Sequence, residues 1–239
     1  MIKLGISGCQ GRMGLRILHL AQEDKEFRIA SLLEHKNHPA VGGQVDKIPI
    51  ASDVKNLKKA DVLIEFSSPE ATMAHCDECV KNNVKMVIGT TGLSDEQIQK
   101  ISKASEKIAI VFASNMSVGV NVLFKLAQIV SEKTSNAYAV KITEAHHVHK
   151  KDAPSGTAKS LAQIIQNATG AKVENIKSIR EDEIVGDHEV VFESKVDTIT
   201  IGHHAKTRDI FAEGSLVAAK YVSAQKKGLF NMQDVLQLK

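Results

Sequence analysis

The fold is decided by the first stretch of the chain, residues 1–14, which reads MIKLGISGCQGRMG. Its apolar beginning, Ile2–Ser7, predicts a buried strand, and a helical periodicity of apolar residues starts at about Arg12. Between them three glycines follow in the spacing G-x-x-G-x-x-G, over Gly8–Gly14. A tight glycine turn between a strand and a helix lets the backbone approach a pyrophosphate, whose charge the helix N-terminus favours. The stretch therefore predicts a dinucleotide-binding domain, although Cys9 stands where the full motif has its second glycine.

An acidic residue strengthens this interpretation. Arg28–Leu33 predicts a second strand, and Glu34 follows it, 20 residues after the last glycine of the turn. A carboxylate in that place can accept hydrogen bonds from the adenosine ribose, and it would repel a 2′-phosphate, which favours NADH. NADPH stays open, because basic residues that could neutralise the phosphate lie nearby, namely Arg12, His35 and Lys36. A glycine turn without a ligand is the alternative.

Further short apolar runs alternate with helical patterns through the first half of the chain. The predicted strands are Ala60–Phe66, Val84–Ile88 and Ile108–Phe112, and helices are predicted after Pro69 and after Ser94. Strands and helices that alternate in this way form parallel βαβ units. We therefore expect an α/β fold with a Rossmann-like, doubly wound parallel sheet.

Two polar segments follow the C-terminal ends of predicted strands. Gly89-Thr90-Thr91-Gly92 follows the fourth strand, and Ala113-Ser114-Asn115-Met116 follows the fifth. Open α/β sheets bind ligands at these strand ends, so both segments are candidates for contact with the nicotinamide half of a cofactor. A plain turn and a linker are the alternatives.

The second half of the chain has a different pattern, with successive strands that have no helix between them. A helix (Val120–Glu132) precedes a strand (Ala137–Ala145), and another helix follows Pro154. Strand-like stretches then come at Val173–Ile179, Glu189–Ser194 and Thr198–His203, and a helix at Gly214–Lys226. This order predicts an α+β domain with a mixed or antiparallel sheet. We place a dinucleotide-binding domain at 1–116, with 217–239 packing back on it, and a substrate-binding domain at 117–216.

Composition excludes several classes of protein. The chain has 239 residues, a net charge of +3 and only 4% aromatic residues, which argues against a nucleic-acid-binding surface. No signal peptide and no apolar run of the ~20 residues that a membrane helix needs is found, so we expect a cytoplasmic protein without membrane contact. Three cysteines do not make a disulfide framework, and Cys76 and Cys79 are expected to be buried structural thiols because they lie in mid-helix.

Residues 144–157 are the densest functional segment. They read EAHHVHKKDAPSGT and hold five histidine or lysine residues at the end of a predicted strand. Such a cluster suits a compact dicarboxylate, and histidine can transfer a proton near neutral pH. Ser155-Gly156-Thr157 begins a helix, whose N–H groups and hydroxyls could hold a carboxylate. A basic surface patch is the alternative.

The same segment could instead bind a metal ion. His146, His147 and His149 could be ligands, but on a strand His147 faces away from its neighbours. No spaced cysteines or second histidine pair accompany them, so we expect no metal.

The segment closely resembles the dihydrodipicolinate (4-hydroxy-tetrahydrodipicolinate) reductase family, whose signature E-A-H-H-x-x-K-x-D-A-P-S-G-T-A is matched by residues 144–158. The resemblance extends over nearly the whole chain, through 8–14, 89–92, 112–119 and 229–232. It implies an NAD(P)H-dependent reduction of a cyclic imine dicarboxylate to tetrahydrodipicolinate, on the diaminopimelate route to lysine. It also implies a homotetramer with the C-terminal sheet at the subunit interface.

The resemblance also implies roles for single residues. His146 would be the proton donor, and Lys150 a second donor or a charge stabiliser. The substrate carboxylates would be held by His147, Gly156 and Thr157, to which the predicted helix start adds Ser155. The cofactor would be contacted by Gly8, Cys9, Gln10, Gly11, Arg12, Met13, Glu34, His35, Gly89, Thr90, Thr91, Ala113, Ser114, Asn115 and Met116.

Two departures from the family pattern matter. The stretch R-x-G-x-x-x-G-x-H occurs at 180–188 with Asp182 at the first glycine, which puts the local turn in doubt. His35 stands where the family often has arginine, which weakens a prediction of NADPH use. Arg208 is a further candidate for a carboxylate contact. Another two-domain NAD(P)-dependent dehydrogenase, or a dinucleotide sensor without catalysis, remains the alternative function.

Overall fold

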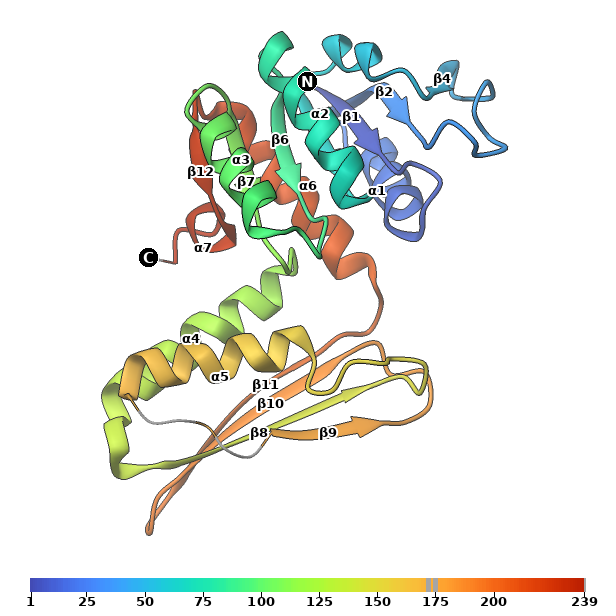
Figure 1. Cartoon of the computed structure of the whole chain (residues 1–239). Coiled ribbons are helices and arrows are strands. Elements are labelled where there is room, and N and C mark those ends of the chain that lie inside the picture. Colours follow the sequence, from blue (N-terminus) through green and yellow to red (C-terminus); the bar gives the residue numbers. More distant parts are fainter. Residues whose placement is uncertain (171–172, 174–175, 239) are drawn as a thin grey trace. The chain divides into compact units, whose positions relative to one another are not determined.

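The computed structural model describes residues 1–170, 173 and 176–238, and the chain divides into two units (Figure 1). The larger unit comprises Met1–Ser117 and Phe211–Gln237, and the smaller unit comprises Val118–Ile210. The boundaries set from the sequence were 116/117 and 216/217. No helix in the described part of the chain is long and apolar enough to cross a membrane.

The larger unit is built on a single sheet. Its strands are β1 (Ile2–Ser7), β2 (Phe27–Leu33), β3 (Gln44–Val45), β4 (Ile48–Ala51), β5 (Val62–Glu65), β6 (Lys85–Ile88), β7 (Ala109–Phe112) and β12 (Gly228–Phe230). They lie in the order β12-β7-β6-β5-β1-β2-β4-β3, and the pairings are parallel except for the β3–β4 hairpin. Strand β2 lies on one side of β1 and β5 lies on the other, so the order of the strands reverses at β1. This reversal is the topological switch point of a doubly wound fold. The predicted fold class is confirmed, whereas β3, β4 and β12 were not predicted.

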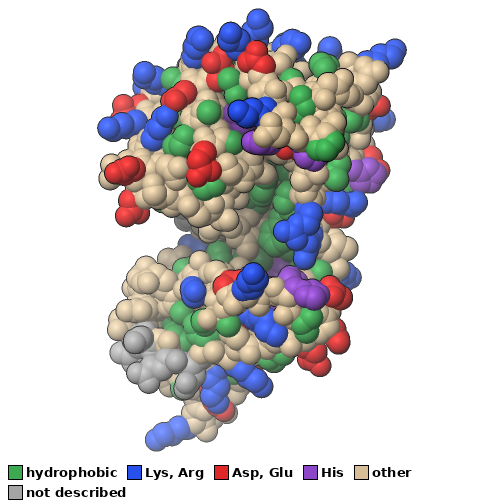
Figure 2. Space-filling model, turned by 45° about the vertical axis from the view of Figure 1, so that its right-hand side comes forward, with side chains coloured by type: hydrophobic (Ala, Val, Ile, Leu, Met, Phe, Trp, Pro, Cys, Tyr) green, Lys and Arg blue, Asp and Glu red, His purple; other side chains and the backbone are tan. Residues whose placement is uncertain are grey.

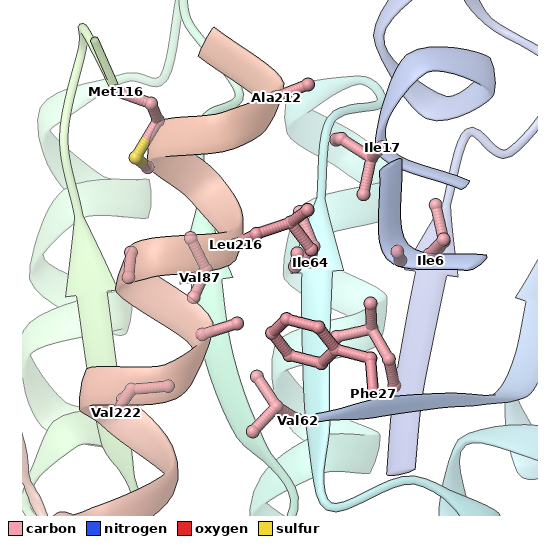
Figure 3. Close-up of a cluster of buried hydrophobic side chains, with 14 of the residues drawn as sticks. Ile6, Ile17, Phe27, Val62, Ile64, Val87, Met116, Ala212, Leu216 and Val222 are labelled. Carbon is pink, nitrogen blue, oxygen red and sulfur yellow. The ribbon is translucent and has the colours of Figure 1, made fainter. Parts of the chain in front are cut away.

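Helices cover both faces of this sheet. On one face α1 (Arg12–Glu23) and α6 (Asp209–Ala224) pack on the central strands, and Figure 3 shows Ile17 and Leu216 facing Ile6, Ile64 and neighbouring side chains. On the other face lie α2 (Pro69–Asn82), α3 (Asp95–Ser105) and the 3-10 turn η1 (Val54–Lys59). Because both faces are covered, the central strands are almost wholly apolar, which is why the sequence predicted them.

The C-terminal part of the chain completes the larger unit. The helix predicted at Gly214–Lys226 begins earlier, at Asp209, and α7 (Met232–Val235) follows β12. A Cβ atom added to Gly214 would stand 1.8 Å from the carbonyl oxygen of Met116, so only glycine permits this close approach. Buried Leu216 and Val222 on α6 then join the core beside the sheet (Figure 3).

The predicted starts of α2 and α3 are confirmed. Ser94 and Gln97 form the capping box at the start of α3, with each side chain bonded to the other's backbone N–H. Pro69 occupies the first turn of α2, where its missing N–H costs no hydrogen bond, and Ser68 caps that helix through the N–H of Ala71.

The smaller unit is an α+β layer, as the sequence predicted. Its strands are β8 (Ala139–His146), β9 (Ile176–Arg180), β10 (Asp187–Glu193) and β11 (Thr198–His204), in the order β11-β10-β8-β9. Among the described strand pairs of this sheet, β8 and β9 alone run parallel, so the sheet is mixed. Ile142, Val190 and Phe192 point from the sheet to the helices α4 (Val118–Thr134) and α5 (Gly156–Thr169), with the turn η2 (Ser135–Ala137) after α4. The expected strand start at Val173 precedes residues 174–175, which lie outside the described residues.

Candidate active site

The glycine turn lies at the C-terminal end of β1 and forms the beginning of α1. Gly8 has φ +66, and a Cβ atom there would stand 2.6 Å from the carbonyl oxygen of Phe66. At Gly14 an added Cβ atom would stand 2.0 Å from the carbonyl oxygen of Gly8, so this glycine allows the helix to pack against the turn. Helix α1 has no side-chain cap and no acidic residue in its first turn. Its N-terminus therefore carries the partial positive charge that suits a pyrophosphate.

Cys9 does not present its side chain to this turn. The thiol is fully buried in the core beside α1, and the Cys9 N–H donates to the carbonyl oxygen of Leu33 at 3.1 Å. Burial, and to a smaller extent the Glu34 carboxylate, raises the pKa of the thiol to about 11. A side chain thus takes the place of the second glycine of the motif without blocking the turn, because it points inward.

Glu34 lies beside the glycine turn. Its carboxylate accepts hydrogen bonds from the N–H of Gln10 at 2.9 Å and from the N–H of His35 at 2.8 Å. Each carboxylate oxygen has further acceptor capacity, so the group can also accept from ribose hydroxyls. Glu34 therefore lies at the turn, as its spacing of 20 residues from Gly14 predicted. Its hydrogen bond from Gln10 also stabilises the turn.

A cavity of about 510 Å³ opens at this place in the larger unit. Four residues that the sequence proposed for cofactor contact line it, Gly8, Gly11, Glu34 and His35. Its other lining residues are Ser7, Leu33, Lys36, Ser52, Phe66, Ser67, Ser68, Ala71, Ala74 and His75. The cavity is thus lined by hydroxyl groups, a carboxylate, basic groups and apolar side chains. This combination suits the adenosine half of a dinucleotide.

The other proposed cofactor residues lie at neighbouring strand ends. Gly89 and Thr90 follow β6, where a Cβ atom on Gly89 would stand 2.3 Å from the ring of Phe66. The Thr90 hydroxyl is buried and accepts from the Thr72 hydroxyl at 3.0 Å. Thr91 and Ser114 are exposed, Ala113 is half-buried, Asn115 accepts from the N–H of Ser117, and the Met116 side chain is in the core (Figure 3). Arg12 is exposed and Met13 is half-buried in the first turn of α1.

The His/Lys segment of the smaller unit spans the end of β8, a loop and the start of α5. Glu144 and His146 are the buried residues near the strand end, and the imidazole Nδ1 lies 2.5 Å from the Glu144 carboxylate. Arg180, at the end of β9, donates to both oxygens of Glu144, at 2.8 and 3.0 Å. Burial by itself would raise the pKa of Glu144, but hydrogen bonds from Arg180, and smaller effects of Ser178 and His146, lower it to about 2. Glu144 is therefore an ionised acceptor.

His188 on β10 completes the surroundings of His146. The two rings meet edge to face, with centroids 5.2 Å apart. Burial, and then the charge of His146, lowers the pKa of His188 to about 4, so its ring is neutral near pH 7. Its Nε2 lies 3.1 Å from the hydroxyl of Ser155. That hydroxyl also accepts from the N–H of Ala158, which makes Ser155 the N-cap of α5.

The predicted substrate residues lie around this core. Gly156 is exposed at the first position of α5, with nothing within 4 Å of an added Cβ atom, and Thr157 follows it. His147 is half-buried, and Arg208 lies beside it with Nη2 3.5 Å from the His147 Nε2. Lys150 forms an ion pair with Asp152 at 2.8 Å, and this pairing lowers the pKa of the Asp152 carboxyl. Figure 2 shows histidine, lysine and arginine side chains on the surface of both units.

The turn at Asp182 is retained despite the missing glycine. Asp182 has φ 45, in the left-handed region, and its carbonyl oxygen accepts from the N–H of Val148 at 3.2 Å. The missing glycine predicted a disturbed turn, but aspartate is one of the few residues other than glycine that adopt this conformation. The loop after His147 is therefore hydrogen-bonded to the segment that follows β9.

Sequence reasoning missed three residues of this cluster, Glu144, Arg180 and His188. All three stand in the quoted motifs, but no role was assigned to them. A signal was present, because Glu144 and His146 are two residues apart on a strand and so point to the same face. The pairing with Arg180 and His188 depends on the sheet order, which the sequence does not reveal.

The cysteine pair of α2 has no redox character. Cys76 and Cys79 are buried in the core, and burial raises the pKa of Cys76 to about 11 and that of Cys79 well above its ordinary value. Thiols of this kind are poor nucleophiles, so the expectation of structural thiols is confirmed.

Two family descriptions match the chain and together span nearly its full length. "Dihydrodipicolinate reductase, N-terminus" matches residues 2–116, and "Dihydrodipicolinate reductase, C-terminus" matches residues 119–236. The chain is 41% identical to the 4-hydroxy-tetrahydrodipicolinate reductase of Polynucleobacter necessarius subsp. necessarius, with 100% of both chains covered. It is 38% identical to the protein of the same name from Syntrophus aciditrophicus, covering 99% of this chain and 98% of the relative.

Solved structures with the same fold agree with these matches. A dipicolinate-bound dihydrodipicolinate reductase from Paenisporosarcina sp. TG-14 superposes with a TM-score of 0.85 at 25% identity, covering 98% of each chain. A probable dehydrogenase from Thermotoga maritima has a TM-score of 0.63 at 11% identity, over 99% of this chain and 93% of that one, which is a likeness of fold alone.

Proposed function

The chain belongs to the dihydrodipicolinate reductase family, and we propose that the residues assembled at its two sites carry out that family's reaction. It is a nicotinamide-dependent 4-hydroxy-tetrahydrodipicolinate reductase, which produces tetrahydrodipicolinate on the diaminopimelate route to lysine. The substrate is (2S,4S)-4-hydroxy-2,3,4,5-tetrahydrodipicolinate. The observation that carries the proposal is the cluster at the end of β8, where His146, Lys150 and the start of α5 lie in one loop-and-strand arrangement.

The larger unit fits a nicotinamide dinucleotide. Gly8 and Gly14 leave room where a Cβ atom would clash, and the uncapped start of α1 favours a pyrophosphate. Glu34 lines the adjoining cavity and would accept from the adenosine ribose. When bound, the cofactor supplies a hydride, and the protein supplies orientation and charge. Gly89, Thr90, Thr91 and the segment 113–116 are proposed for its nicotinamide half.

Cofactor choice follows from the same cavity. The Glu34 carboxylate favours the ribose hydroxyls of NADH, whereas His35 and Lys36, which also line the cavity, could pair with the 2′-phosphate of NADPH. We propose that the enzyme uses both cofactors and prefers NADH, because the glutamate lies against the glycine turn.

Substrate binding is assigned to the smaller unit. The first N–H groups of α5, at Gly156 and Thr157, would hold one carboxylate, since helix N-termini favour anions. His147, with Arg208 beside it, would bind the other carboxylate. Ser155 was proposed as a direct contact, but its hydroxyl caps α5 and meets His188, so we assign it to shaping the helix start.

Proton transfer is assigned to His146 and Lys150. The substrate loses its 4-hydroxyl group as water to give a conjugated cyclic imine. Hydride addition to that imine leaves an enamine, which must take one proton to give the product. His146 would donate that proton, and Lys150 would stabilise the negative charge that develops beside it. The pairing of Lys150 with Asp152 keeps the ammonium group at the mouth of the loop until an anionic substrate competes for it.

Assembly and compartment are proposed from the sheet of the smaller unit and from the cysteines. Helices α4 and α5 pack on one face of the four-stranded sheet, and the other face carries exposed polar residues such as Lys141 and Glu193, which pair across strands. We propose that this second face forms the subunit interface of the homotetramer that the family resemblance implies. The three free cysteines, all buried, suit the reducing cytoplasm.

The activity is tested by NADH oxidation with substrate generated enzymatically in the same vessel. The expected result is substrate-dependent oxidation, with tetrahydrodipicolinate identified by mass spectrometry. Folded protein that binds NADH but gives no turnover would refute the proposed activity. Turnover with another small carboxylated substrate instead would assign the chain to a different reaction.

A further inference from the structure

We propose that Glu144, held by Arg180, is a positioning residue that fixes the Nδ1–H of His146, so that Nε2 is the atom that gives up the proton. The inference rests on the proposed function, in which His146 is the proton donor. It adds a second layer to that site: a buried ion pair whose task is to set the tautomer and orientation of the acid.

Several hydrogen bonds hold the carboxylate of Glu144 in one position. Its side chain is fully buried and accepts two hydrogen bonds from the Arg180 guanidinium, in the bidentate geometry that is strongest for this pair. The N–H of Ser155 donates to Oε1 at 3.3 Å. Arg180 in turn donates to the carbonyl oxygens of Ile179 and Asp152, both at 2.6 Å. The carboxylate thus joins the ends of β8 and β9 to the loop before α5.

The ring of His146 has only one way to satisfy this carboxylate. Because Glu144 is ionised, it can only accept, so Nδ1 at 2.5 Å must carry the hydrogen. The donor proton is then the one on Nε2. A carboxylate bonded to one imidazole nitrogen while the other transfers a proton is the arrangement that orients the histidine of hydrolase triads.

The space around Nε2 is kept open by a glycine. A Cβ atom added to Gly186 would stand 3.1 Å from the His146 Nε2, tighter than ordinary contact. Gly186 is the second glycine of the 180–188 motif, and it precedes β10 by one residue. The glycine is therefore explained by the room that the reacting nitrogen needs. The edge of the neutral His188 ring limits His146 from another side.

The groups around His146 shift its pKa in opposite directions. Burial lowers its pKa most, Lys150 and Arg180 lower it further, and Glu144 raises it. Loss of the Glu144 charge would therefore move the pKa of His146 further down. The proton donor would then be lost at a lower pH, which gives a signature that simple misfolding would not produce.

The proton step balances without any added group. Protonated His146 donates its Nε2 proton to the enamine carbon, the electron pair of the enamine forms the new C–H bond, and the ring is left neutral with its Nδ1–H on Glu144. The carboxylate stays ionised throughout, because its pKa of about 2 is far below that of imidazole.

The test compares Glu144→Gln with Glu181→Gln, a matched substitution at an exposed glutamate next to Arg180. For Glu144→Gln we expect kcat/KM to fall on the order of 10²-fold or more, as loss of a positioned general acid does. The descending limb of its pH profile should move to lower pH, and its affinity for NADH should be unchanged. Glu181→Gln should match the parent enzyme. A parallel loss at every pH, with the limb in place, would overturn the inference.

A spectroscopic measurement tests the same point without turnover. Nitrogen-15 chemical shifts of the His146 ring, in protein without substrate at a pH above the ring's pKa, should identify the neutral ring as the Nδ1–H tautomer in the parent enzyme. In Glu144→Gln they should indicate a mixture of tautomers. A ring protonated on Nε2 in the parent enzyme would contradict the inference.

Two further variants separate the possible failures. If Glu144→Gln does not fold, Gly186→Ala tests the same geometry from the other side of the ring, and it should lower kcat more than it raises KM. An unchanged kcat in this variant would contradict the inference.

His146→Gln tests the proposed function itself: full activity would remove His146 as donor. Loss of activity there, with an unaltered Glu144→Gln enzyme, would reject only the positioning role.

Discussion

Lys150 is the residue proposed to stabilise the negative charge that develops on the substrate. For Lys150→Ala we expect kcat to fall by roughly 10²–10⁴-fold, the usual contribution of a positioned acid or charge, while the affinity for NADH hardly changes. Steady-state kinetics and NADH titration measure the two effects. Lys151→Ala, at the exposed neighbour, is the control. Activity that survives in Lys150→Ala would remove Lys150 from the mechanism.

Asp182 carries a local strain that a single substitution can relieve. Its φ of 45 costs a residue with a Cβ atom energy that glycine does not pay. Glycine also loses more chain entropy on folding, so we expect Asp182→Gly to stabilise the protein by only about 0.5–1 kcal/mol. Thermal unfolding measures it. A lower melting temperature for Asp182→Gly would mean that the aspartate side chain makes a compensating contact.

The residues around His146 show which side chains of the site could be predicted from the sequence. The roles of His146 and Lys150 could be predicted because the motif at 144–158 resembles that of the family, whereas the residues alone indicated a basic cluster suited to a dicarboxylate. The position of Glu144 two residues before His146 on a strand was a signal that was not used, whereas nothing in the sequence places Arg180 and His188 beside them. Only the order β10-β8-β9 brings Arg180 and His188 to the two sides of β8.

Among the elements, the start of helix α5 is the one proposed to bind a substrate carboxylate. Gly156→Ala places a methyl group in open space at the exposed first position of the helix, so it should not disturb the fold. It would occupy room that the carboxylate needs, and we expect KM for the substrate to rise roughly tenfold, equivalent to about 1.4 kcal/mol. The melting temperature should stay the same.

The matched control for Gly156→Ala is Gly170→Ala, at the other end of the same helix. Gly170 has φ +73, so alanine there should lower stability and leave KM unchanged. An unchanged KM in Gly156→Ala would show that the carboxylate binds elsewhere.

Elements were predictable where burial was complete. Strands β1, β2, β5, β6 and β7 are covered on both faces, so each is mostly apolar, with few polar residues such as Lys3 and Arg28. Strands β3 and β12 have two and three residues, too few for a pattern, and they form only at the sheet edges. The start of α6 was missed because Asp209–Phe211 precede the run of small buried residues that marks the helix.

For the molecule as a whole, buried histidines make stability depend on pH. The pKa of His188 is lowered from 6.5 to about 4 by burial, so the unfolded chain binds a proton before the folded one does. Stability from this group is therefore complete above about pH 6.5 and is lost as the pH falls toward 4. Between about pH 7 and pH 5 we expect a loss of roughly 2 kcal/mol in the free energy of unfolding.

Calorimetry at several pH values, with hydrogen exchange of the β10 amides to locate the effect, measures this loss. The variant His188→Gln should remove most of the dependence, and His149→Gln, at an exposed histidine, should not. Equal stability at about pH 5 and about pH 7 in the parent protein would contradict the interpretation of His188 as a buried neutral ring.

The division into a cofactor unit and a substrate unit is the most general feature of the molecule. It could be inferred because the pattern of the sequence changes near residue 116, from alternating strands and helices to successive strands. That the C-terminal helix returns to the first core was also inferred, whereas Gly214, which allows α6 to approach Met116, could be interpreted only once the two segments were seen together.

The reaction itself is tested most directly by following the hydride. The enzyme is supplied with NADH deuterated at the transferring position of the nicotinamide and with enzymatically generated hydroxy-tetrahydrodipicolinate. The tetrahydrodipicolinate formed should carry one deuterium for each cofactor oxidised, as mass spectrometry can determine. Product without deuterium, or no product from folded enzyme that binds NADH, would contradict the assignment of this chain as a nicotinamide-dependent reductase.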